Sequence, residues 1–547
     1  MAAVPTNNRT TTSPLSSALL PQLDAGLGAS VQEDGKPRVS SASHQSSSSG
    51  VAVVLSNRGG KSLLSTFQQG GRWGTVFNMC AAILGAGVLS LPRALAAMGL
   101  VPGVILIVLT GILTHYSVVL LISAIRATNT KSFEDLAYLT IGRWNGRLVE
   151  LSIVIFQLGT LAGYTVAIGD ILSVVIQLPS VQHHAPWLTR EVIIVLFWST
   201  LMLPLSFVER ISSLQGTSLI STLALTYLVI AVVVHFALDA AVAPSLTVGK
   251  AKLFNPTLDA VSASAIFLFA FTCQVNVPSL YDALQRKTPA EMSAVSKRAV
   301  ILCMGFYLCV GLAGYFDFPE SAQGNLLNNY CLLDPSVTSF APKPPRVILA
   351  AFGAISLTIT MAYPINVYPT RYTLDGMLFR RHGERHRLKR HVGLTLLIAC
   401  VTLVPALVKV DISVVFELSA GTTSAYVCYC IPAAAAWRLR ERIPQTRTRL
   451  GRLAVRLLFV FGVLVGVLST STTVYGIVQG APPTPAPCSN ETSRSAHHRA
   501  HHDLLLRDHD PRHAAFTSAA VMEGVAAGRV AHDHGAPSSG AWSSWLV

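Results

Sequence analysis

Charged residues are scarce in this 547-residue chain: only 12% of the residues are Asp, Glu, Lys or Arg, whereas 51% are hydrophobic. So small a polar fraction excludes a water-soluble globule, which needs more polar surface to face the solvent. We count about eleven apolar runs of the roughly 20 residues that a membrane-crossing helix takes. Because lipid admits only helices or closed barrels, we expect an all-α integral membrane bundle. The expected spans are residues 74–98, 101–125, 147–178, 191–208, 212–238, 258–284, 298–317, 345–372, 391–409, 411–437 and 453–479.

Acidic residues are the rarer charge: 27 Asp and Glu against 41 Lys and Arg give a net charge of +14. Such basicity alone would suit a nucleic-acid partner, but the cations gather on alternate loops, as in residues 126–147, 286–298, 380–390 and 438–456. The lipid bilayer is therefore the expected partner, and nucleic acid is not. By the positive-inside rule the N-terminus is cytoplasmic, and an odd number of spans places the C-terminus outside the cell or in a lumen.

Residues 1–73 lack a short apolar core after a basic start, so we expect no cleaved signal peptide. Their richness in Ser, Gly and Asn predicts a disordered cytoplasmic tail. The membrane domain is expected over 74–479, and a disordered exoplasmic or lumenal tail over 480–547. Histidines gather in that second tail, but without the periodicity that would fix a metal site, so no metal is predicted.

Two cysteines and one glycosylation sequon fall on the predicted exoplasmic side. Cys331 and Cys488 lie outside the apolar helices that hold the other cysteines. A disulfide between them would persist on that side, although the sequence leaves open both a bridge and two separate thiols. Asn490 begins an Asn-Glu-Thr sequon and is a predicted glycosylation site.

Helix-breaking residues interrupt two expected spans. The sequence LGAGVLSLP, residues 84–92, interrupts the first span, and CQVNVP, residues 273–278, interrupts the sixth. Breaks at corresponding positions of two halves indicate a five-plus-five inverted repeat with a binding site near the bilayer midplane. Unwound amides and carbonyls attract a polar guest, and Gly85 and Gly87 allow the backbone to approach it closely. The alternative is that these small residues serve only close helix packing.

Ionisable residues are absent from the central thirds of the first, sixth and eighth spans. Since such residues inside a membrane usually mark a charged pathway, their absence favours a zwitterion over a highly charged guest. Of the acidic residues in the spans, Glu417 lies farthest from a helix end. It is therefore the candidate to carry a proton or to bind a cationic group. Paired catalytic groups at membrane depth are also missing, so we expect neither an enzyme nor a cofactor, and no catalytic residue is predicted.

Several motifs resemble those of one known family. The segments that carry the resemblance, which together extend over about residues 72–440, are FNMCAAILGAGVLSLPRALAAMG at 77–99, SFEDLAYLTIG at 132–142, FAFTCQVNVPSLYDAL at 269–284, LTITMAYPINVYPTRYTL at 357–374 and GTTSAYVCYCIPAAAAWRL at 421–439. They resemble the amino acid/auxin permease family, and the C-Q-x-N run and GLAGYFDF at 311–318 are most similar to its kinetoplastid amino acid permeases.

The resemblance implies an eleven-helix inverted repeat and L-amino acids as the substrate class. By this match the amino acid's α-carboxylate and α-amine would be held by Leu84, Gly85, Ala86 and Gly87, with Phe271, Gln274 and Asn276 on the opposite wall.

The resemblance leaves the coupling ion open between H⁺ and Na⁺. Where sodium-coupled members carry an asparagine, this chain has Ala81, and Ala362 replaces a family threonine. Because a hard cation binds through several oxygens, these losses weaken the case for sodium. Thr358 and Thr360 remain candidate ion ligands, with ordinary hydrogen bonding between helices as the alternative.

The sequence therefore predicts a secondary active transporter of L-amino acids that works by alternating access and is coupled to protons or sodium. The alternative is an amino-acid-sensing receptor with the same fold. The plasma membrane is expected rather than a vacuolar or lysosomal membrane.

Overall fold

The computed structural model describes residues 71–176, 183–185, 187–207, 217–242, 251–330, 345–379 and 387–480. Within these ranges the chain is helical and has no strand. Nine described helices are long and apolar enough to cross a membrane, and the bent pair at the start of the chain makes ten. The expected all-α membrane architecture is therefore confirmed, with a smaller number of full-length spans than the eleven expected.

The first span is broken where the sequence predicts. Helix α2 (Arg72–Ile83) ends at an extended Leu84, a 3-10 turn covers Ala86–Ser90, and α3 (Leu91–Met98) follows at an angle of 51° across the break. Gly85 is extended, with φ −127° and ψ −160°. Because Pro92 lies in the first turn of α3, where no helical donor is needed, it starts the second half without strain.

The sixth span is interrupted in the same manner. Helix α12 (Leu258–Ala270) is followed by a 3-10 turn at Gln274–Asn276 and by α13 (Val277–Ala283). Thr257 caps the start of α12 by accepting a hydrogen bond from the Ala260 amide, and Pro278 begins α13. Each interruption thus divides its span into two half-helices, one before the break and one after it.

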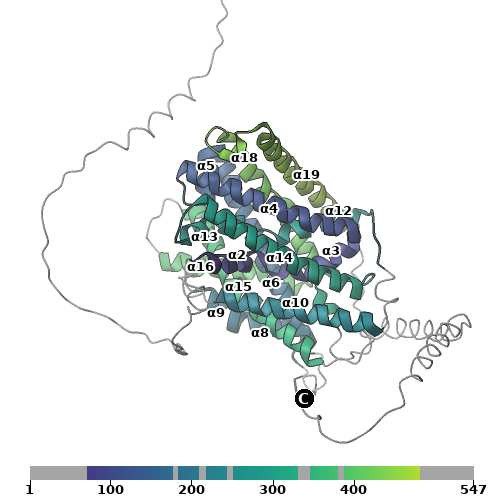
Figure 1. Ribbon diagram of the computed structural model, residues 1–547. Coiled ribbons are helices and arrows are strands. Elements are labelled where there is room, and N and C mark those ends of the chain that lie inside the picture. Colours follow the sequence, from purple (N-terminus) through teal and green to yellow (C-terminus); the bar gives the residue numbers. More distant parts are fainter. Residues whose placement is uncertain are drawn as a thin grey trace, which may run out of the picture. The chain divides into compact units, whose positions relative to one another are not determined.

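Most of the other spans are continuous helices. They are α4 (Leu100–Thr128), α6 (Arg143–Ile176), α10 (Thr217–Val242), α14 (Pro289–Asp317), α15 (Pro345–Phe379), α16 (Arg387–Leu407) and α19 (Arg449–Gln479). Helix α14 begins nine residues before the expected 298, because Thr288 caps it and Pro289 occupies its first turn. In Figure 1, α4, α14 and α10 run alongside one another through the bundle, and these neighbours are in contact.

Two spans contain π-helical segments, which often mark functional or irregular sites. The fourth consists of α8 (Arg190–Phe197), a π segment at Trp198–Met202 and α9 (Leu203–Ser206). Its described part is too short to count as a full span, which explains the difference from the expected eleven. The tenth contains α17 (Ile412–Ser419), π segments at Ala420–Ser424 and Tyr426–Cys430, and α18 (Ile431–Arg438).

A short helix, α5 (Phe133–Ile141), connects α4 to α6 and contains the predicted SFEDL block. The Ser132 hydroxyl caps it by accepting a hydrogen bond from the Asp135 amide. Of the two predicted tails, only residues 71–73, which include the start of α2, and residue 480 are described. Asn490, Cys331 and Cys488 lie outside the described residues, and so do the glycosylation and disulfide predictions.

Candidate functional site

A cavity lies between the two broken helices. It is bordered by four elements, each of which contributes a distinct part of the wall. The lining residues are Ala82, Ile83, Gly85 and Gly87 from the first break; Phe269, Ala270, Thr272, Cys273, Val275 and Asn276 from the sixth span; Phe156, Gln157, Thr160 and Tyr164 from α6; and Asn366 from α15. The sequence-based expectation that both breaks face one site therefore agrees with this geometry.

The main chain at the first break has amides that no helix uses. Among the described residues, no amide from Gly85 to Gly87 donates to another main-chain carbonyl; the next such bond runs from Val88 to Gly85. These amides belong to the start of the second half-helix, where partial positive charge accumulates. This wall is suited to a carboxylate.

One tyrosine contacts the C-terminal carbonyl groups of both half-helices that precede the breaks, α2 and α12. The Tyr307 hydroxyl, on α14, is within hydrogen-bonding distance of the Ile83 carbonyl oxygen at 2.8 Å and of the Ala270 carbonyl oxygen at 2.6 Å. Tyr307 is fully buried, and a phenol has a single proton to donate. The two breaks are thus connected through one hydrogen-bond donor.

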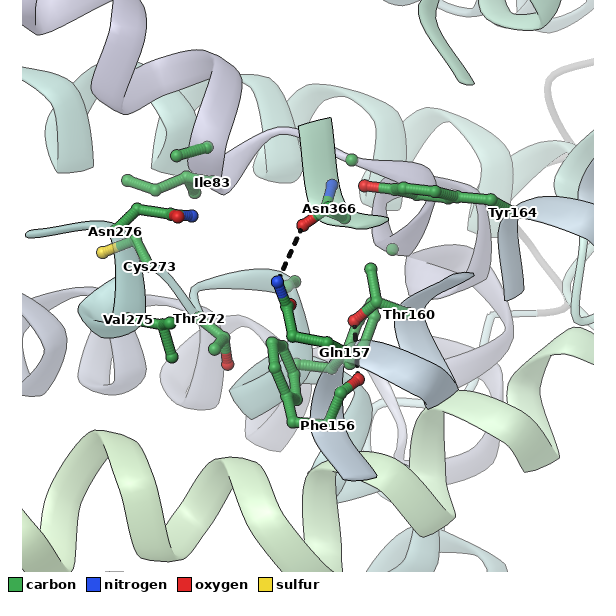
Figure 2. Close-up of a pocket in the computed structure, with 15 residues that line it drawn as sticks. Ile83, Phe156, Gln157, Thr160, Tyr164, Thr272, Cys273, Val275, Asn276 and Asn366 are labelled. Atoms are coloured by element: carbon green, nitrogen blue, oxygen red, sulfur yellow. Dashed lines mark hydrogen bonds between the residues drawn. The ribbon is translucent and has the colours of Figure 1, made fainter. Parts of the chain in front are cut away.

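Amide and hydroxyl side chains form the polar wall opposite the breaks. Gln157 donates from Nε2 to Asn366 Oδ1 at 3.4 Å, and Asn366 donates from Nδ2 to the Ala362 carbonyl at 2.9 Å. Figure 2 shows these two amides meeting across the cavity, with the Tyr164 hydroxyl directed toward Asn366. All of these groups are neutral, so the wall can orient a polar guest without fixing a net charge.

An aromatic cluster forms the apolar wall. The Phe269 ring stacks on Phe416 with centroids 4.1 Å apart, and Phe156 packs against Phe269 at 5.7 Å. Gly87 lies directly beneath this wall: a Cβ there would lie 3.0 Å from Phe269 Cδ1. At Gly85 a Cβ would lie 2.9 Å from the Tyr164 hydroxyl. A Cβ at either position would therefore require the neighbouring side chain to shift, and neither glycine has an unusual φ.

The predicted wall residues divide into two groups. Gly85, Gly87 and Asn276 line the cavity, whereas Leu84, Ala86, Phe271 and Gln274 are buried beside it and do not line it. Gln274 instead braces the break: its Oε1 accepts from the Cys273 amide at 3.0 Å, and its Nε2 lies 3.5 Å from Ser117 Oγ. The Phe271 ring packs edge-on against Tyr307.

The candidate ion ligands lie outside the cavity lining. Thr358 and Thr360, on α15, donate to the carbonyls of Ala354 and Ser356 one turn earlier, so their hydroxyl oxygens can still accept. Glu417, on α17, accepts a hydrogen bond from Thr473 on α19 at 3.3 Å. No contact between the described residues joins these three side chains into one site.

Most of the lining residues were not predicted, and among them the polar side chains of α6 and α15 are Gln157, Thr160, Tyr164 and Asn366. They lie in the middle of long, continuous helices, where no break marks them. The Asn366 side chain falls within the predicted eighth-span motif, and a polar residue in the centre of an apolar span was the available signal.

The cavity is narrow. Only about 30 Å³ of it is wide enough to admit the centre of a water molecule. A guest of amino-acid size therefore requires the walls to move apart from the arrangement described here.

Comparisons with known proteins agree with this picture. Residues 68–475 match the family model described as transmembrane amino acid transporter protein. A Mus musculus protein provisionally named sodium-coupled neutral amino acid transporter 11 is 27% identical over 414 residues, covering 75% of this chain and 86% of that protein. A Schizosaccharomyces pombe protein named vacuolar amino acid transporter 5 is 26% identical over 416 residues, covering 74% of this chain and 94% of that protein.

Among solved structures, the crystal structure of MhsT in complex with L-phenylalanine is 14% identical and overlays with a TM-score of 0.45, covering 74% of this chain and 99% of that one. The family match extends over most of the chain and includes both broken spans, the polar wall and the Tyr307 helix. The chain belongs to the transmembrane amino acid transporter family.

Proposed function

We propose that this protein carries L-amino acids across a membrane by alternating access, with the cavity between the two broken helices as its substrate site. The observation that carries the proposal is the pairing of two interrupted main chains around one cavity, linked through Tyr307. Main-chain groups at helix breaks recognise the parts that all amino acids share, which are the carboxylate and the ammonium group.

In this proposal the substrate carboxylate accepts hydrogen bonds from the unused amides of Gly85–Gly87. The ammonium group faces the carbonyl ends of α2 and α12, where partial negative charge collects. The substrate side chain then extends toward Gln157, Asn366 and the Phe269 ring. Because this wall contains both amides and aromatics, it favours uncharged side chains.

The small size of the closed cavity supports the alternating-access part of this proposal. Because the cavity does not hold an amino acid as it stands, binding and release require the two broken helices to move relative to α6 and α15. The close approach of Gly85 to Tyr164 on α6 is one contact that such a motion would alter, since a Cβ on Gly85 would lie 2.9 Å from the Tyr164 hydroxyl.

Transport of this kind is secondary, with a proton or sodium gradient as the driving force. Thr358 and Thr360 are the proposed oxygens for sodium, and Glu417 is the proposed proton carrier. We also propose that the protein lies in the plasma membrane. The S. pombe relative differs here, since its name refers to the vacuole.

The test is uptake of labelled L-amino acids by purified full-length protein in proteoliposomes. Parallel samples would have an inward sodium gradient, an inward proton gradient, both or neither. We expect saturable uptake that one gradient accelerates. Binding of an amino acid without uptake under any gradient would contradict transport and favour the sensing receptor; absence of both binding and uptake would remove the cavity as a substrate site.

A further inference from the structure

A second polar cluster lies away from the substrate cavity, where α10 meets α14. It consists of His235 and Asp239, one turn apart on α10, and Asp317, the last residue of α14. The three side chains are nearly inaccessible, with exposed fractions of 5%, 4% and 1%. An imidazole and two carboxylates in such a place need an explanation, because buried ionisable groups inside membranes usually serve a function.

The three groups converge on one point. His235 Nδ1 lies 2.9 Å from Asp317 Oδ2 and 3.5 Å from Asp239 Oδ2. One ligand atom from each of the three residues lies within 4.8 Å of the others. Ligand atoms held tetrahedrally at about 2.0–2.1 Å from zinc are separated by about 3.3 Å, so the cluster requires only small shifts to enclose an ion.

The surroundings also direct polar groups to this point. The loop after α14 folds back, and the Tyr330 ring packs edge-on against His235 with centroids 4.7 Å apart. The Tyr330 side chain is buried, and its hydroxyl interacts with the Asp317 carboxyl. The Phe318 ring also packs edge-on against Tyr330, with centroids 5.3 Å apart. The cluster is thus closed from solvent by aromatic rings, with one further oxygen close by.

We propose that His235, Asp239 and Asp317 form a binding site for a divalent transition-metal ion, with Zn²⁺ as the best fit. An imidazole nitrogen excludes Mg²⁺ and Ca²⁺ as preferred occupants, because these ions take oxygen ligands. Two carboxylates balance the charge of a divalent ion. Three protein ligands leave a fourth position for water. When zinc binds to Nδ1, the imidazole proton moves to Nε2, or one proton is released if the ring begins as imidazolium.

This site would join three elements that are separate in the sequence. It connects α10 to α14 and, through Tyr330, to the loop that follows α14. The same loop is attached to the first break, where Ser90 Oγ donates to the Gly324 carbonyl at 2.6 Å, and to α6, where Asn325 Nδ2 donates to Asp170 Oδ2 at 3.2 Å. An ion at this site would restrain the loop and both helices together.

The test measures Zn²⁺ binding to the full-length protein by competition with a fluorescent chelator. The histidine-rich tail would add background binding, so all variants are made in a full-length background with His497, His498, His501, His502, His509, His513, His532 and His534 replaced by serine. We expect one tightly held Zn²⁺ per chain and no comparable binding of Mg²⁺ or Ca²⁺. His235→Gln and Asp317→Asn should weaken binding by roughly 100-fold, since each removes one of three protein ligands.

His115→Gln is the matched control. It removes another helix histidine, whose Nδ1 is within 3.2 Å of Ser296 Oγ and which lies outside the cluster, so zinc affinity should not change. A second measurement, which needs no substitution in the cluster, is the absorption spectrum of the parent protein with Co²⁺ in place of Zn²⁺. Co²⁺ with a low coordination number and nitrogen and oxygen ligands absorbs strongly, whereas hydrated Co²⁺ does not. Any one of three results would overturn the proposal: a cobalt spectrum typical of the hydrated ion, no stoichiometric zinc binding at micromolar zinc, or unchanged zinc affinity in a folded His235→Gln variant. The cluster would then be a histidine hydrogen-bonded between two carboxyl groups.

Discussion

The hydroxyl of Tyr307 lies 2.8 Å from the carbonyl oxygen of Ile83, the last residue of α2. The same hydroxyl lies 2.6 Å from the carbonyl of Ala270, the last residue of α12. Two helices that are far apart in the sequence therefore end at a single donor. Because this donor has one proton, the two carbonyls must share it.

Tyr307→Phe should therefore reduce both transport rate and stability. The change removes the donor but keeps the ring, so a buried carbonyl is left without its partner, at an expected loss of about 1–3 kcal/mol in the free energy of unfolding. Uptake and thermal unfolding of the purified variant measure the two effects.

Tyr315→Phe is the matched control for this change. Tyr315 is on the same helix and is equally buried, but its hydroxyl bonds to the main chain of Lys252, away from the breaks. We expect it to lower stability and leave the rate per folded molecule intact. Equal loss of turnover in both variants would show that the Tyr307 bond has no special relation to the cavity.

Gly87→Val should abolish uptake while membrane insertion continues. Even a Cβ at this position would lie 3.0 Å from Phe269 Cδ1, and the β-branched side chain would also fill the proposed carboxylate site. Gly305→Val controls for a valine placed in a membrane helix, because nothing lies within 4 Å of a Cβ there. Normal uptake by Gly87→Val would refute the role of the first break in binding.

Gln157→Ala should change the preference among amino acids more than Gln274→Ala does. Gln157 lines the cavity and bonds to Asn366, whereas Gln274 points to Ser117 and supports the main chain. Competition between unlabelled amino acids for uptake gives the order of preference in each variant. If Gln274→Ala reorders the substrates and Gln157→Ala does not, the wall assigned here is the wrong one.

Glu134→Gln should stabilise the protein at neutral pH. Burial raises the pKa of the Glu134 carboxyl above its usual value, despite a hydrogen bond from Thr373 at 3.3 Å. The folded chain therefore holds this proton more tightly than the unfolded chain does. The contribution of Glu134 to stability is fully present below its unfolded pKa of about 4.3 and falls as pH rises toward the folded pKa.

The unfolding temperature of Glu134→Gln should accordingly exceed that of the parent at pH 7 and approach it near pH 4. Asp135→Asn is the control, since it removes an exposed carboxylate from the same first turn of α5 and thus the same favourable interaction with the helix dipole. A pH-independent difference between parent and Glu134→Gln would contradict the role of burial.

Micromolar Zn²⁺ should slow uptake by the parent protein and leave uptake by His235→Gln unaffected. The reason is mechanical: a bound ion would fix α10 and α14 to the loop that Ser90 holds at the first break. The measurement is the initial uptake rate at increasing zinc, with a chelator to reverse the effect. Inhibition that is identical in both proteins would place the inhibitory ion elsewhere.

The sequence predicted the interruptions better than the side chains around them. Glycine and proline mark a break by local chemistry, so residues 84–92 and 273–278 could be read directly. The direction of a side chain at a break depends on tertiary contacts, which is why Gln274 turned out to brace the main chain instead of lining the cavity. Similarly, nothing local to Gln157 or Asn366 shows that they face each other across two helices.

The metal-ligand cluster shows the same limit. His235 and Asp239 form a recognisable pair one turn apart, but Asp317 joins them only through the packing of α14 on α10. The fourth span was expected at 191–208, and the described helical segment from Arg190 to Ser206 agrees with it, although apolar composition alone did not show its π segment.

The stacked rings of Phe269 and Phe416, with Phe156 beside them, have an electrical consequence. Hydrated ions do not pass a dry aromatic barrier, because leaving water for an apolar layer costs an ion many kcal/mol. In the proposed transport cycle, a site closed by these rings would move its cargo in discrete steps and would not short-circuit the voltage across the membrane. The three phenylalanines would then serve as insulation, which keeps an energised membrane charged while the site is empty.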